Sequence, residues 1–409
     1  MIRTQVGIVG AGPAGLTLSH LLHLAGIESV VLENRDRAYV EARVRAGVLE
    51  QGSVDLLVQT GVGDRLRRQG MVHHGVNFQL DGERHHVDLT GLSGGRSITI
   101  YGQQEVVKDL IAARLAAGGE VHFEVDDVRV EGIGDEVGHP GDTDRPVIRF
   151  RTKAGDEEEL HCDIVAGCDG FHGVCRDAVP DGVLRSFERE YPFAWLGILA
   201  RTPASCDELI YSNHERGFGL YSLRSPEISR LYLQVPPDEP IADWPDDRIW
   251  AELQVRLTSP GWSLNEGPLI EKGITQMRSF VVEPMQHGRL FLAGDAAHIV
   301  PPTGAKGMNL AIADVKVLAE ALLHWYRKGD GTGLAAYSAT CLSRVWRVQD
   351  FSRTMTELFH QGLGGGDFDR NVQKARLRYV WSSPAMATVI AENYVGLPLP
   401  GMDIDQLMA

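Results

Sequence analysis

The sequence predicts an α/β protein that also carries an antiparallel β-sheet and a helical C-terminal region. The first observation is a short apolar run, Thr4–Gly10, which leads into a glycine-rich turn and then into helical periodicity. The second is a series of closely spaced β-type runs between Phe187 and Gln234. The third is the helical pattern that follows Leu310. A chain of 409 residues with this pattern is expected to form more than one domain.

Composition narrows the class of protein. Hydrophobic residues at 43% and charged residues at 23% are ordinary for a globular protein and exclude extended disorder. A net charge of −15 repels phosphates and anionic membranes, so we expect no nucleic-acid partner and no membrane partner. The five cysteines form no CxxC pair, so we expect reduced thiols, no metal site and a soluble cytoplasmic protein without a signal peptide.

The N-terminal segment has the pattern of a Rossmann-like dinucleotide-binding unit. An apolar strand meets Gly10, Gly12 and Gly15 in a GxGxxG turn, and a second apolar run, Glu28–Leu32, ends in Glu33. The three glycines permit a tight turn, close approach of a pyrophosphate and close packing of the helix, while the carboxylate suits a ribose diol. The alternative is a glycine-rich turn in a helix–sheet layer that binds nothing.

The next elements extend this unit. Arg43 and Arg45 are surface residues in isolation, but beside a pyrophosphate they would be its counter-charges. Met71–Leu89 alternates as a hairpin does and contains His73, and Gln103 opens a helix that runs to about Ala117. Further elements are strands within Val121–Leu160 around a loop at Gly132–Arg145, and a buried strand within Asp163–Gly173 that ends in a Gly/Asp turn.

The β-rich segment contains a polar cluster. Ser222 and Arg224 are two positions apart, so they face the same side of one strand, and Tyr232 on the next strand is placed to join them. Such a cluster suits a carboxylate, because arginine offers two parallel donors. The alternative is an ordinary solvated sheet face. A helix at Asp246–Leu257 and a strand at Met277–Val282 follow.

The stretch from Leu290 to Leu310 has the features of a binding loop. A buried strand, Leu290–Ala293, ends in Gly294 and Asp295, and the prolines and glycines of Ile299–Gly307 then fix the backbone before a helix at Met308–Leu323. A helix start is positive and its first amides are unpaired, which suits an electron-rich ligand. The alternative is a simple strand-to-helix connection. The helical pattern is strongest in three segments: Leu310–Tyr326, Gly333–Met355 and Arg370–Tyr379.

These motifs together resemble a known family. GAGPAG with Glu33, then CDGFHG and GDAAHIVPP, is a set similar to that of the single-component flavoprotein aromatic hydroxylases. The resemblance extends over essentially the whole chain, through RVRAGVLEQG, YGQQEV and IAENYVGLP, and is weakest at Glu131–Arg145 and Phe359–Gln373. It implies an FAD-dependent monooxygenase that converts 4-hydroxybenzoate to 3,4-dihydroxybenzoate through a flavin hydroperoxide, in the degradation of aromatic compounds.

The resemblance also implies which residues bind FAD, with the glycines and Glu33 at its adenosine and pyrophosphate half and the 302–309 segment beside its isoalloxazine. The residues are Gly10, Gly12, Gly15, Glu33, Arg43, Arg45, Gln103, Asp169, Asp295, Lys306, Gly307, Met308 and Asn309.

For the substrate, the resemblance implies that Ser222, Arg224 and Tyr232 hold the carboxylate. Tyr211 and Tyr394 would flank the phenol, with a carbonyl from Pro302 near it. A phenolate is a better nucleophile than a phenol, so a proton must leave the buried site. We expect it to pass from Tyr211 through Tyr394 to His73, whose ordinary pKa of about 6.5 suits exchange with water.

The hydride donor is implied less directly. His172 and Arg278 would contact a nicotinamide nucleotide, and the segment from Asn34 to Tyr39 would lie at the extra phosphate of NADPH. In that segment Arg35 and Arg37 would pair with the phosphate while Asp36 would repel it, so NADPH is favoured over NADH without excluding NADH.

The resemblance finally implies a domain division and a homodimer. The FAD-binding domain is expected at residues 1–73, 98–184 and 271–352, the substrate-binding sheet at 74–97 and 185–270, and a helical region with the dimer contact at 353–409. Three alternatives remain open. They are a hydroxylase of a related acid such as 3-hydroxybenzoate or 4-aminobenzoate, a flavin disulfide reductase (which would need a redox cysteine pair that is absent), and a non-catalytic FAD-binding protein.

Overall fold

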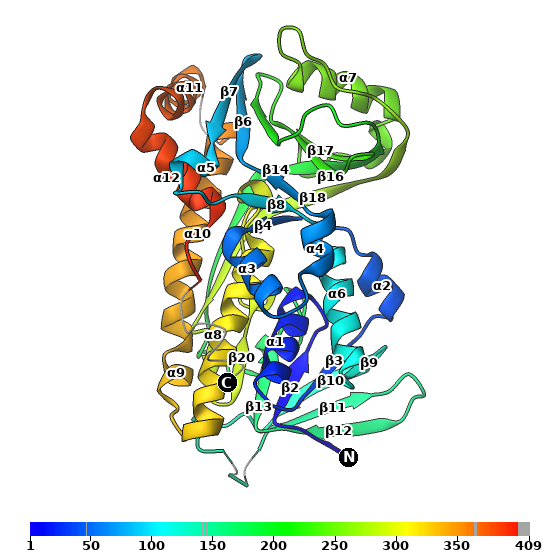
Figure 1. Ribbon diagram of the computed structural model, residues 1–409. Helices are drawn as coiled ribbons and strands as arrows, with labels where there is room; N and C mark the ends of the chain where they lie inside the picture. The colour runs from blue at the N-terminus through cyan, green and yellow to red at the C-terminus, as the bar shows by residue number, and fades with distance from the viewer. Residues whose placement is uncertain (46, 141, 144, 364–365, 400–409) are drawn as a thin grey trace.

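The computed structural model describes residues 1–45, 47–140, 142–143, 145–363 and 366–399. Figure 1 shows an elongated molecule with the N-terminus and a first sheet at one end, and a second, larger sheet at the other. Long C-terminal helices run along one side between the two ends. Residues 400–409 of the predicted C-terminal region lie outside the described residues.

The first sheet has six strands in the order β19-β20-β13-β2-β3-β9, and its central pairings are parallel. Its central strand β2 is buried at every position, as expected where helices cover both faces of a parallel sheet. The strands are β2 Val6–Val9, β3 Ser29–Glu33, β9 Glu120–Phe123, β13 Ile164–Gly167, β19 Gln286–His287 and β20 Leu290–Leu292. This sheet confirms the predicted Rossmann-like class.

Three helices pack around this sheet, and α1 contacts both of the others. They are α1 Pro13–Leu24, α6 Gln103–Ala116 and α8 Gly307–Lys328. Helix α1 begins at Pro13, whose ring fixes a helical φ where no amide donor is needed. Helix α8 ends at Gly329, which takes the left-handed conformation (φ 67°) and follows two basic residues in the last turn.

Two smaller sheets flank the first. One has the order β1-β12-β11-β10 and the other β4-β8-β5. Their strands are β1 Ile2–Arg3, β10 Asp126–Glu131, β11 Val147–Arg151, β12 Glu157–His161, β4 Val48–Glu50, β5 Met71–His73 and β8 Ile98–Ile100. The predicted hairpin at Met71–Leu89 is therefore wrong at its start, because β5 leaves it to pair with β8 and brings His73 opposite Ile98.

The second sheet has eight strands in the order β21-β18-β14-β17-β16-β15-β6-β7. The strands are β6 Gly75–Leu80, β7 Glu83–Asp88, β14 Arg185–Arg201, β15 Ile210–Asn213, β16 Gly219–Ser225, β17 Ile228–Val235, β18 Leu269–Glu283 and β21 His298–Ile299. The pairings are antiparallel except that of β15 with β6, which is parallel and joins segments far apart in the chain. The predicted antiparallel sheet is confirmed apart from this pair.

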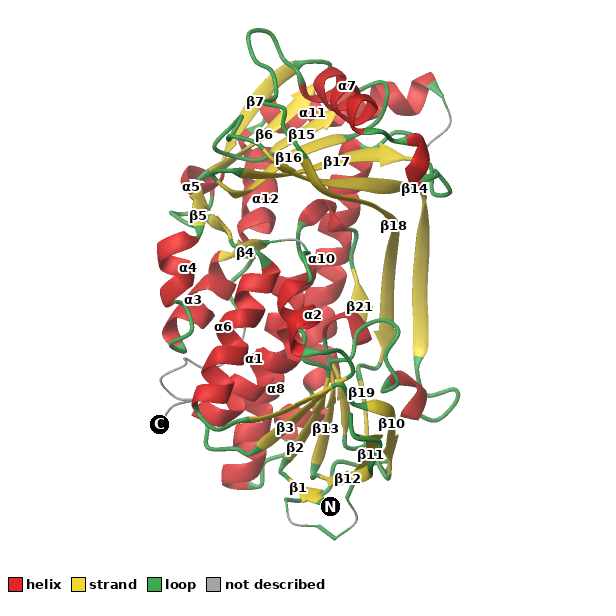
Figure 2. Ribbon diagram, turned by 90° about the vertical axis from the view of Figure 1, so that its right-hand side faces the viewer, coloured by secondary structure: helices red, strands yellow, loops and turns green. Residues whose placement is uncertain are grey.

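Strands β14 and β18 are unusually long, with 17 and 15 residues, and they pair along most of their length. Figure 2 shows them running from the level of the first sheet up into the second. Their register shifts between Glu190 and Ala194, where residues 191–193 of β14 lie opposite the single residue Met277 of β18. A two-stranded ribbon thus runs between the two sheets, and its hydrogen-bond ladder is interrupted at this shift.

The remaining elements are mostly helical. The long predicted segment Gly333–Met355 divides into α9 and α10 at Ala336. The other helices and turns are α2 Arg37–Ala42, α3 Gln51–Gln59, α4 Asp64–Gln69, α5 Leu89–Leu92, α7 Asp246–Leu257, α9 Thr332–Ala335, α10 Tyr337–Phe359, α11 Asp367–Ser382, α12 Pro384–Val395, η1 Arg176–Ala178, η2 Ile241–Asp243, η3 Gly294–Ala296 and η4 Pro302–Gly304. Within the described ranges, no helix combines the length and hydropathy that a membrane crossing needs.

Candidate active site

The glycine-rich turn after β2 is built for close approach. A Cβ on Gly10, whose φ is 106°, would lie 2.3 Å from the carbonyl oxygen of Cys168, and one on Gly15 would lie 2.0 Å from that of Gly10. A Cβ on Gly12 would meet nothing within 4 Å. Helix α1 begins here without a side-chain cap and without an acidic residue in its first turn. An open backbone at an uncapped helix start fits the pyrophosphate of a dinucleotide.

Glu33 closes this turn from the end of β3. Its carboxylate accepts hydrogen bonds from the backbone N–H of Ala11, at 2.8 Å, and from that of Arg35, at 2.9 Å. The two bonds orient the side chain toward the glycine turn. A carboxylate has about four lone-pair sites, so acceptor capacity remains for a ribose diol.

Asp295 lies in η3, directly after β20, and sits beside the two predicted arginines. Asp295 is solvent-exposed, yet partial desolvation by the surrounding protein raises its pKa, while His298, Arg45 and Arg43 act in the opposite direction through their charges. The structure therefore brings Arg43, Arg45 and Asp295 together, although they are about 250 residues apart in the chain. Two arginines beside one carboxylate suit a ligand that carries both an anionic group and hydroxyl groups.

Two further predicted cofactor residues occupy the rim of the first sheet. The Asp169 carboxylate accepts the backbone N–H of Cys175 at 2.9 Å through one oxygen. Its other oxygen is buried and has no protein partner within the described part of the chain, which leaves an acceptor for a bound group. Gln103 is the first residue of α6 and is partly buried.

The side chains of Lys306 and Asn309, at the start of α8, bond to other parts of the protein. The buried ammonium of Lys306 donates to Glu50 Oε1 at 2.7 Å and to the carbonyl oxygen of Tyr394 at 2.8 Å. The Asn309 side chain accepts the N–H of Glu50 at 2.9 Å and donates to the carbonyl of Val48 at 2.9 Å. Both side chains hold protein segments together, because a buried charge or amide needs partners. The prediction for this segment concerns its backbone amides, which these side-chain bonds do not occupy.

The backbone at the same helix start remains suited to the cofactor. Helix α8 has no side-chain cap and no acidic residue in its first turn, and a Cβ on Gly307 would meet nothing within 4 Å. Its first residues are Gly307 and Met308, two of the residues predicted to lie beside the isoalloxazine. The unpaired amides and the positive helix end fit the pyrimidine side of a reduced flavin, which gains negative charge.

The predicted carboxylate cluster forms on β16 and β17. Ser222 Oγ donates to the carbonyl of Arg230 at 2.9 Å. Arg224 Nη1 donates to the carbonyl of Leu223 at 3.0 Å, but its Nε is buried and has no partner among the described residues. Burial by itself would raise the pKa of Tyr232, yet the charges of Arg230 and Arg224 outweigh it and lower that pKa. The site is therefore cationic and carries an unused donor, as a carboxylate requires.

Arg230 is a site residue that the sequence analysis missed. Its Nε donates to the Tyr232 hydroxyl at 3.2 Å, and its charge also acts on Arg224 and Arg45. It thus lies between the carboxylate cluster and the predicted cofactor arginines. The signal was present in the sequence, because Arg230 and Tyr232 are two positions apart and must face the same side of a strand.

Tyr211 and Tyr394 meet as predicted. Their hydroxyl oxygens lie 2.6 Å apart, and both residues are about 1% exposed. Burial and the neighbouring Tyr394 raise the pKa of Tyr211 well above its usual value. The Tyr211 hydroxyl also donates to the carbonyl of Thr303 at 2.9 Å. Thr303 is a second residue that the sequence analysis missed.

Pro302 lies next to Thr303 in η4. Its carbonyl accepts the backbone N–H of Ala305 at 2.9 Å and so closes the turn. The carbonyl that contacts Tyr211 belongs to Thr303 rather than to Pro302. A carbonyl oxygen has two lone pairs, so Pro302 keeps one for a ligand.

His73 differs from expectation in its acidity. It is 2% exposed, and neither ring nitrogen has a hydrogen-bond partner among the described residues. Burial lowers its pKa to about 4, although Glu208 and Asp207 oppose the shift through their charges. The expectation that His73 keeps its ordinary pKa is therefore wrong, because a buried imidazolium loses its hydration. No hydrogen bond within the described part of the chain joins it to Tyr394.

The predicted nicotinamide residues form two separate groups. In the first, the Arg35 guanidinium lies 5.2 Å from the ring centre of Tyr39, and the Asp36 side chain accepts the N–H of Tyr39 at 2.7 Å as the cap of α2. In the second, the ring of Phe171 contacts the ring of His172 (4.9 Å between centroids), and the guanidinium of Arg278 lies 4.8 Å from its centre. Asp36 thus has a structural role that its charge alone did not indicate.

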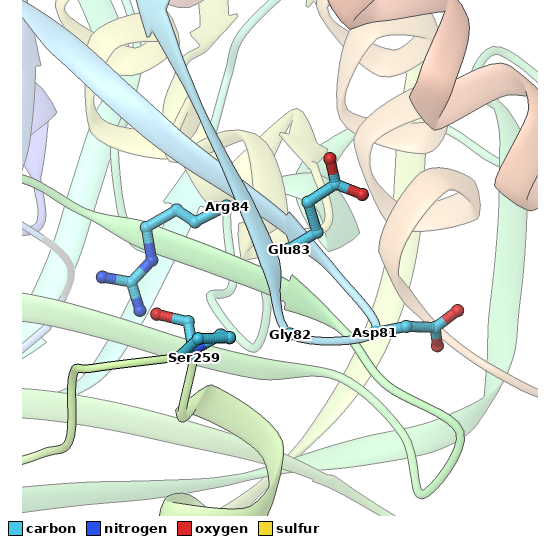
Figure 3. Close-up of a pocket in the computed structure, with 6 residues that line it drawn as sticks. Asp81, Gly82, Glu83, Arg84 and Ser259 are labelled. Carbon is cyan, nitrogen blue, oxygen red and sulfur yellow. The ribbon is translucent and has the colours of Figure 1, made fainter.

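The surface hollow in Figure 3 lies away from all of these residues. It is lined by Asp81, Gly82, Glu83, Arg84, Ser259 and Pro260, around the turn between β6 and β7. Arg84 donates to Gln79 Oε1 at 2.9 Å and stacks at 4.0 Å over the ring of Trp262. The Arg84 guanidinium is therefore already engaged in holding the β6–β7 hairpin to the C-terminal end of α7.

Comparisons with known proteins agree with this geometry. Residues 3–352 match the family described as "FAD binding domain". The chain is 47% identical over 407 residues to a p-hydroxybenzoate hydroxylase from Acinetobacter baylyi (strain ATCC 33305 / BD413 / ADP1), which covers 99% of this chain and 98% of that protein.

Other similar proteins are more distant. An uncharacterized aromatic compound monooxygenase from Bacillus subtilis (strain 168) is 24% identical and covers 77% of this chain and 60% of its own length. The crystal structure of p-nitrophenol 4-monooxygenase from Pseudomonas putida DLL-E4 shares the fold, with a TM-score of 0.79 at 18% identity over 96% of this chain and 98% of that one. The chain therefore belongs to the FAD binding domain family and, within it, to the FAD-dependent aromatic hydroxylases.

Proposed function

We propose that the chain hydroxylates 4-hydroxybenzoate to 3,4-dihydroxybenzoate, with FAD as cofactor and with O₂ and NADPH or NADH as co-substrates. The observation that carries the proposal is the buried hydroxyl pair of Tyr211 and Tyr394, 2.6 Å apart, in a chain that also carries a cationic cluster around Arg224. A phenol at one end and a carboxylate at the other match a para-substituted ring acid. The 47% identity to a p-hydroxybenzoate hydroxylase supports the same substrate.

Binding begins with the carboxylate of the substrate. The unpaired Nε of Arg224 is available to it, with Ser222 and Tyr232 as further donors. A charge-assisted bond to a buried donor contributes about 1.5–3 kcal/mol, so this end sets most of the affinity. Arg230 reinforces the positive potential, since its Nε donates to Tyr232 while its buried Nη1 has no partner among the described residues and is a further donor for the carboxylate.

Activation of the ring requires movement of the phenol proton. Tyr211 donates to the Thr303 carbonyl, so its partner Tyr394 is the donor within the tyrosine pair. A substrate phenol that donates to Tyr211 would turn the Tyr211 hydroxyl from Thr303 toward Tyr394. Because burial keeps the pKa of Tyr211 high, the tyrosine passes the proton on and does not hold a negative charge itself.

His73 is placed by this proposal at the outer end of the proton path. Its low pKa, about 4, makes it a transient carrier that releases a proton at once at neutral pH. Such a carrier passes protons outward without storing charge in the core. Pro302 contributes its remaining carbonyl lone pair near the phenol.

The cofactor would be held by groups from four elements. Gly12 and the start of α1 suit its pyrophosphate, Glu33 its ribose, Arg43 and Arg45 its phosphates, and Asp295 its ribityl chain. The remaining predicted contacts are Gly10, Gly15, Gln103, Asp169 and the backbone of residues 306–309. When reduced by the nicotinamide, bound FAD supplies the activation of O₂. The protein's part is to orient the ring acid and to exclude water around it.

The co-substrate would contact the groups around Tyr39 and Phe171. Arg35 is positioned for an additional phosphate, and Asp36 is engaged as a helix cap, which supports NADPH as the preferred donor. His172 and Arg278 would hold the rest of the nucleotide. NADH, which lacks the phosphate, would use the same path with weaker binding.

We also propose a cytoplasmic homodimer with the three-part division given above. All five cysteines are free thiols, as is usual in a reducing compartment. Phe368 and Tyr379 are 77% and 57% exposed on α11, and they offer apolar surface to a second copy in the helical region.

The test is direct. Purified protein loaded with FAD is mixed with NADPH in air, with and without 4-hydroxybenzoate, while NADPH absorbance and product are followed. We expect 4-hydroxybenzoate to accelerate NADPH oxidation and to yield 3,4-dihydroxybenzoate. The same assay with 3-hydroxybenzoate and 4-aminobenzoate separates related substrates, and no stimulation by any of the three would reject the proposal.

A further inference from the structure

A buried histidine lies behind the substrate pocket, outside every group considered so far. His360 is the C-terminal cap of α10 and is 1% exposed. Its ring stacks on Phe193 (4.5 Å between centroids, 12° between planes) and on Phe218 (4.3 Å, 30°). Both ring nitrogens are nevertheless hydrogen-bonded. A histidine held in this way has one orientation and one pattern of protons.

The two hydrogen bonds define the tautomer. Nδ1 lies 3.0 Å from the carbonyl oxygen of Thr356, which accepts but cannot donate, so Nδ1 carries the proton. Nε2 lies 2.6 Å from Nε1 of Trp195, which can only donate, so Nε2 is the acceptor. The ring must therefore be neutral, and burial lowers its pKa to about 3. Protonation would leave an imidazolium N–H pointing at an indole N–H.

Each hydrogen bond leads to one end of the substrate pocket. Trp195, on β14, packs against Tyr232 with 4.7 Å between ring centroids, at the carboxylate end. The hydroxyl oxygen of Thr356 lies 3.0 Å from that of Thr303, whose carbonyl accepts the Tyr211 hydroxyl at the phenol end. One imidazole thus connects a strand of the second sheet to the C-terminal helices and, through them, to η4.

We infer that His360 is a positioning residue that fixes the distance between the carboxylate end and the phenol end of the pocket, and so favours para-substituted over meta-substituted ring acids. The inference rests on the proposed function. The para and meta isomers differ in the distance from the carboxylate to the ring hydroxyl. A pocket whose two ends could move relative to each other would therefore accept either isomer. A rigid connection between the two ends keeps this distance constant and so increases the selectivity for the para isomer.

The decisive variant is His360→Phe, which keeps an aromatic ring in the stack and removes both hydrogen bonds. We expect the preference for 4-hydroxybenzoate over 3-hydroxybenzoate, measured as the ratio of kcat/KM values, to fall about fivefold or more. The affinity for FAD should stay unchanged, because no FAD-binding group contacts the ring. An unchanged preference in the folded, FAD-loaded variant would overturn the inference.

A double-mutant cycle tests the route of the effect. Trp195→Phe removes the indole N–H, so it should lower the same preference, and the double variant should be no worse than the more impaired single variant. Independent, multiplying losses would mean that the Trp195–His360 bond does not transmit the effect. His20→Phe is the matched control, since His20 is also buried and bonded to a backbone carbonyl, that of Thr60. It should lower stability and leave the preference intact.

A spectroscopic measurement on the wild-type protein stands apart from activity. In ¹⁵N-histidine NMR spectra, His360 should be neutral with Nδ1 protonated from pH 5 to 8, and its signals should shift in Trp195→Phe. Titration in that range, or protonation at Nε2, would overturn the inference even if His360→Phe does not fold. A wild-type protein that hydroxylates neither isomer would instead reject the proposed function, while the tautomer measurement would still hold.

Discussion

The hydroxyl oxygens of Tyr211 and Tyr394 lie 2.6 Å apart although 183 positions separate them in the chain. One tyrosine comes from β15 of the second sheet and the other from the last helix, α12. Two buried phenols at this distance share a proton readily. Neither hydroxyl is much more basic than the other, so neither keeps the proton. The arrangement therefore serves transfer of a proton between partners on either side, and this determines what its removal should do.

Tyr211→Phe should separate binding from hydroxylation. The variant keeps the ring and loses the hydroxyl, so 4-hydroxybenzoate should still bind and still stimulate NADPH oxidation. Without deprotonation of the phenol, product formed per NADPH should fall by at least about tenfold, since a positioned proton carrier typically contributes 10²–10⁴. Product and hydrogen peroxide are quantified together, and complete coupling would remove Tyr211 from the chemistry.

Arg224→Lys should weaken substrate binding while leaving the charge in place. Lysine cannot supply the planar pair of donors, and the loss of one buried charge-assisted bond costs about 1.5–3 kcal/mol, or roughly ten- to hundredfold in the dissociation constant. The dissociation constant is measured by titrating the FAD-loaded protein with 4-hydroxybenzoate and following the flavin absorbance. Arg248→Lys, at an exposed arginine on α7 that pairs with Glu239, is the control. Equal affinities for both variants would place the carboxylate elsewhere.

Two glycine substitutions should have different consequences although they are two residues apart. Gly10→Ala forces a left-handed φ and a clash with the Cys168 carbonyl, so it should destabilise the apoprotein by about 1–3 kcal/mol or more. Gly12→Ala meets no protein atom within 4 Å and has an extended φ of −77°, so the apoprotein should unfold as the wild type does. Its affinity for FAD should nevertheless fall.

Thermal unfolding with and without FAD distinguishes the two variants. If Gly12→Ala binds FAD as tightly as the wild type, the pyrophosphate does not approach the backbone at this turn.

Acid should destabilise the protein through its buried neutral histidines. The folded pKa of His73 is depressed to about 4 from about 6.5 in the unfolded chain, so the unfolded state binds the proton more readily. The stabilisation is present above pH 6.5 and is lost as pH falls toward 4, at about 1.4 kcal/mol per pH unit. Urea unfolding at several pH values should show a shallower loss in His73→Gln. His74→Gln, at the exposed neighbour, should keep the wild-type slope.

Local pattern in the sequence was sufficient for the parallel sheet, the glycine turn and the strand positions of Ser222 and Arg224. The local sequence pattern was insufficient to predict the contacts of a side chain whose partner lies far along the chain. The segment of Lys306 is predicted beside the cofactor through its backbone, but no local pattern indicates that the Lys306 ammonium is buried against Glu50, 256 positions away. The ordinary pKa assumed for His73 failed for the same reason, since its burial depends on segments that a local reading does not bring together.

Thr303 shows a different limit. Its hydroxyl and carbonyl face two separate partners, Thr356 and Tyr211, and neither is near it in sequence. A threonine in a Pro-Pro-Thr-Gly loop gives no local sign of such a role. Arg230, in contrast, is predictable from strand alternation, because it lies two positions from Tyr232 and must face the same side of the strand.

The ribbon formed by β14 and β18 restricts how the two sheets move. A ladder of backbone hydrogen bonds can twist or bend, but it cannot slide by one residue without turning every side chain to the opposite face. The carboxylate cluster can therefore swing relative to the first sheet but cannot drift along the ribbon. The register shift between Glu190 and Ala194 interrupts the ladder and is its natural point of flexure. The connection between the two sheets therefore permits bending and keeps the strand register fixed.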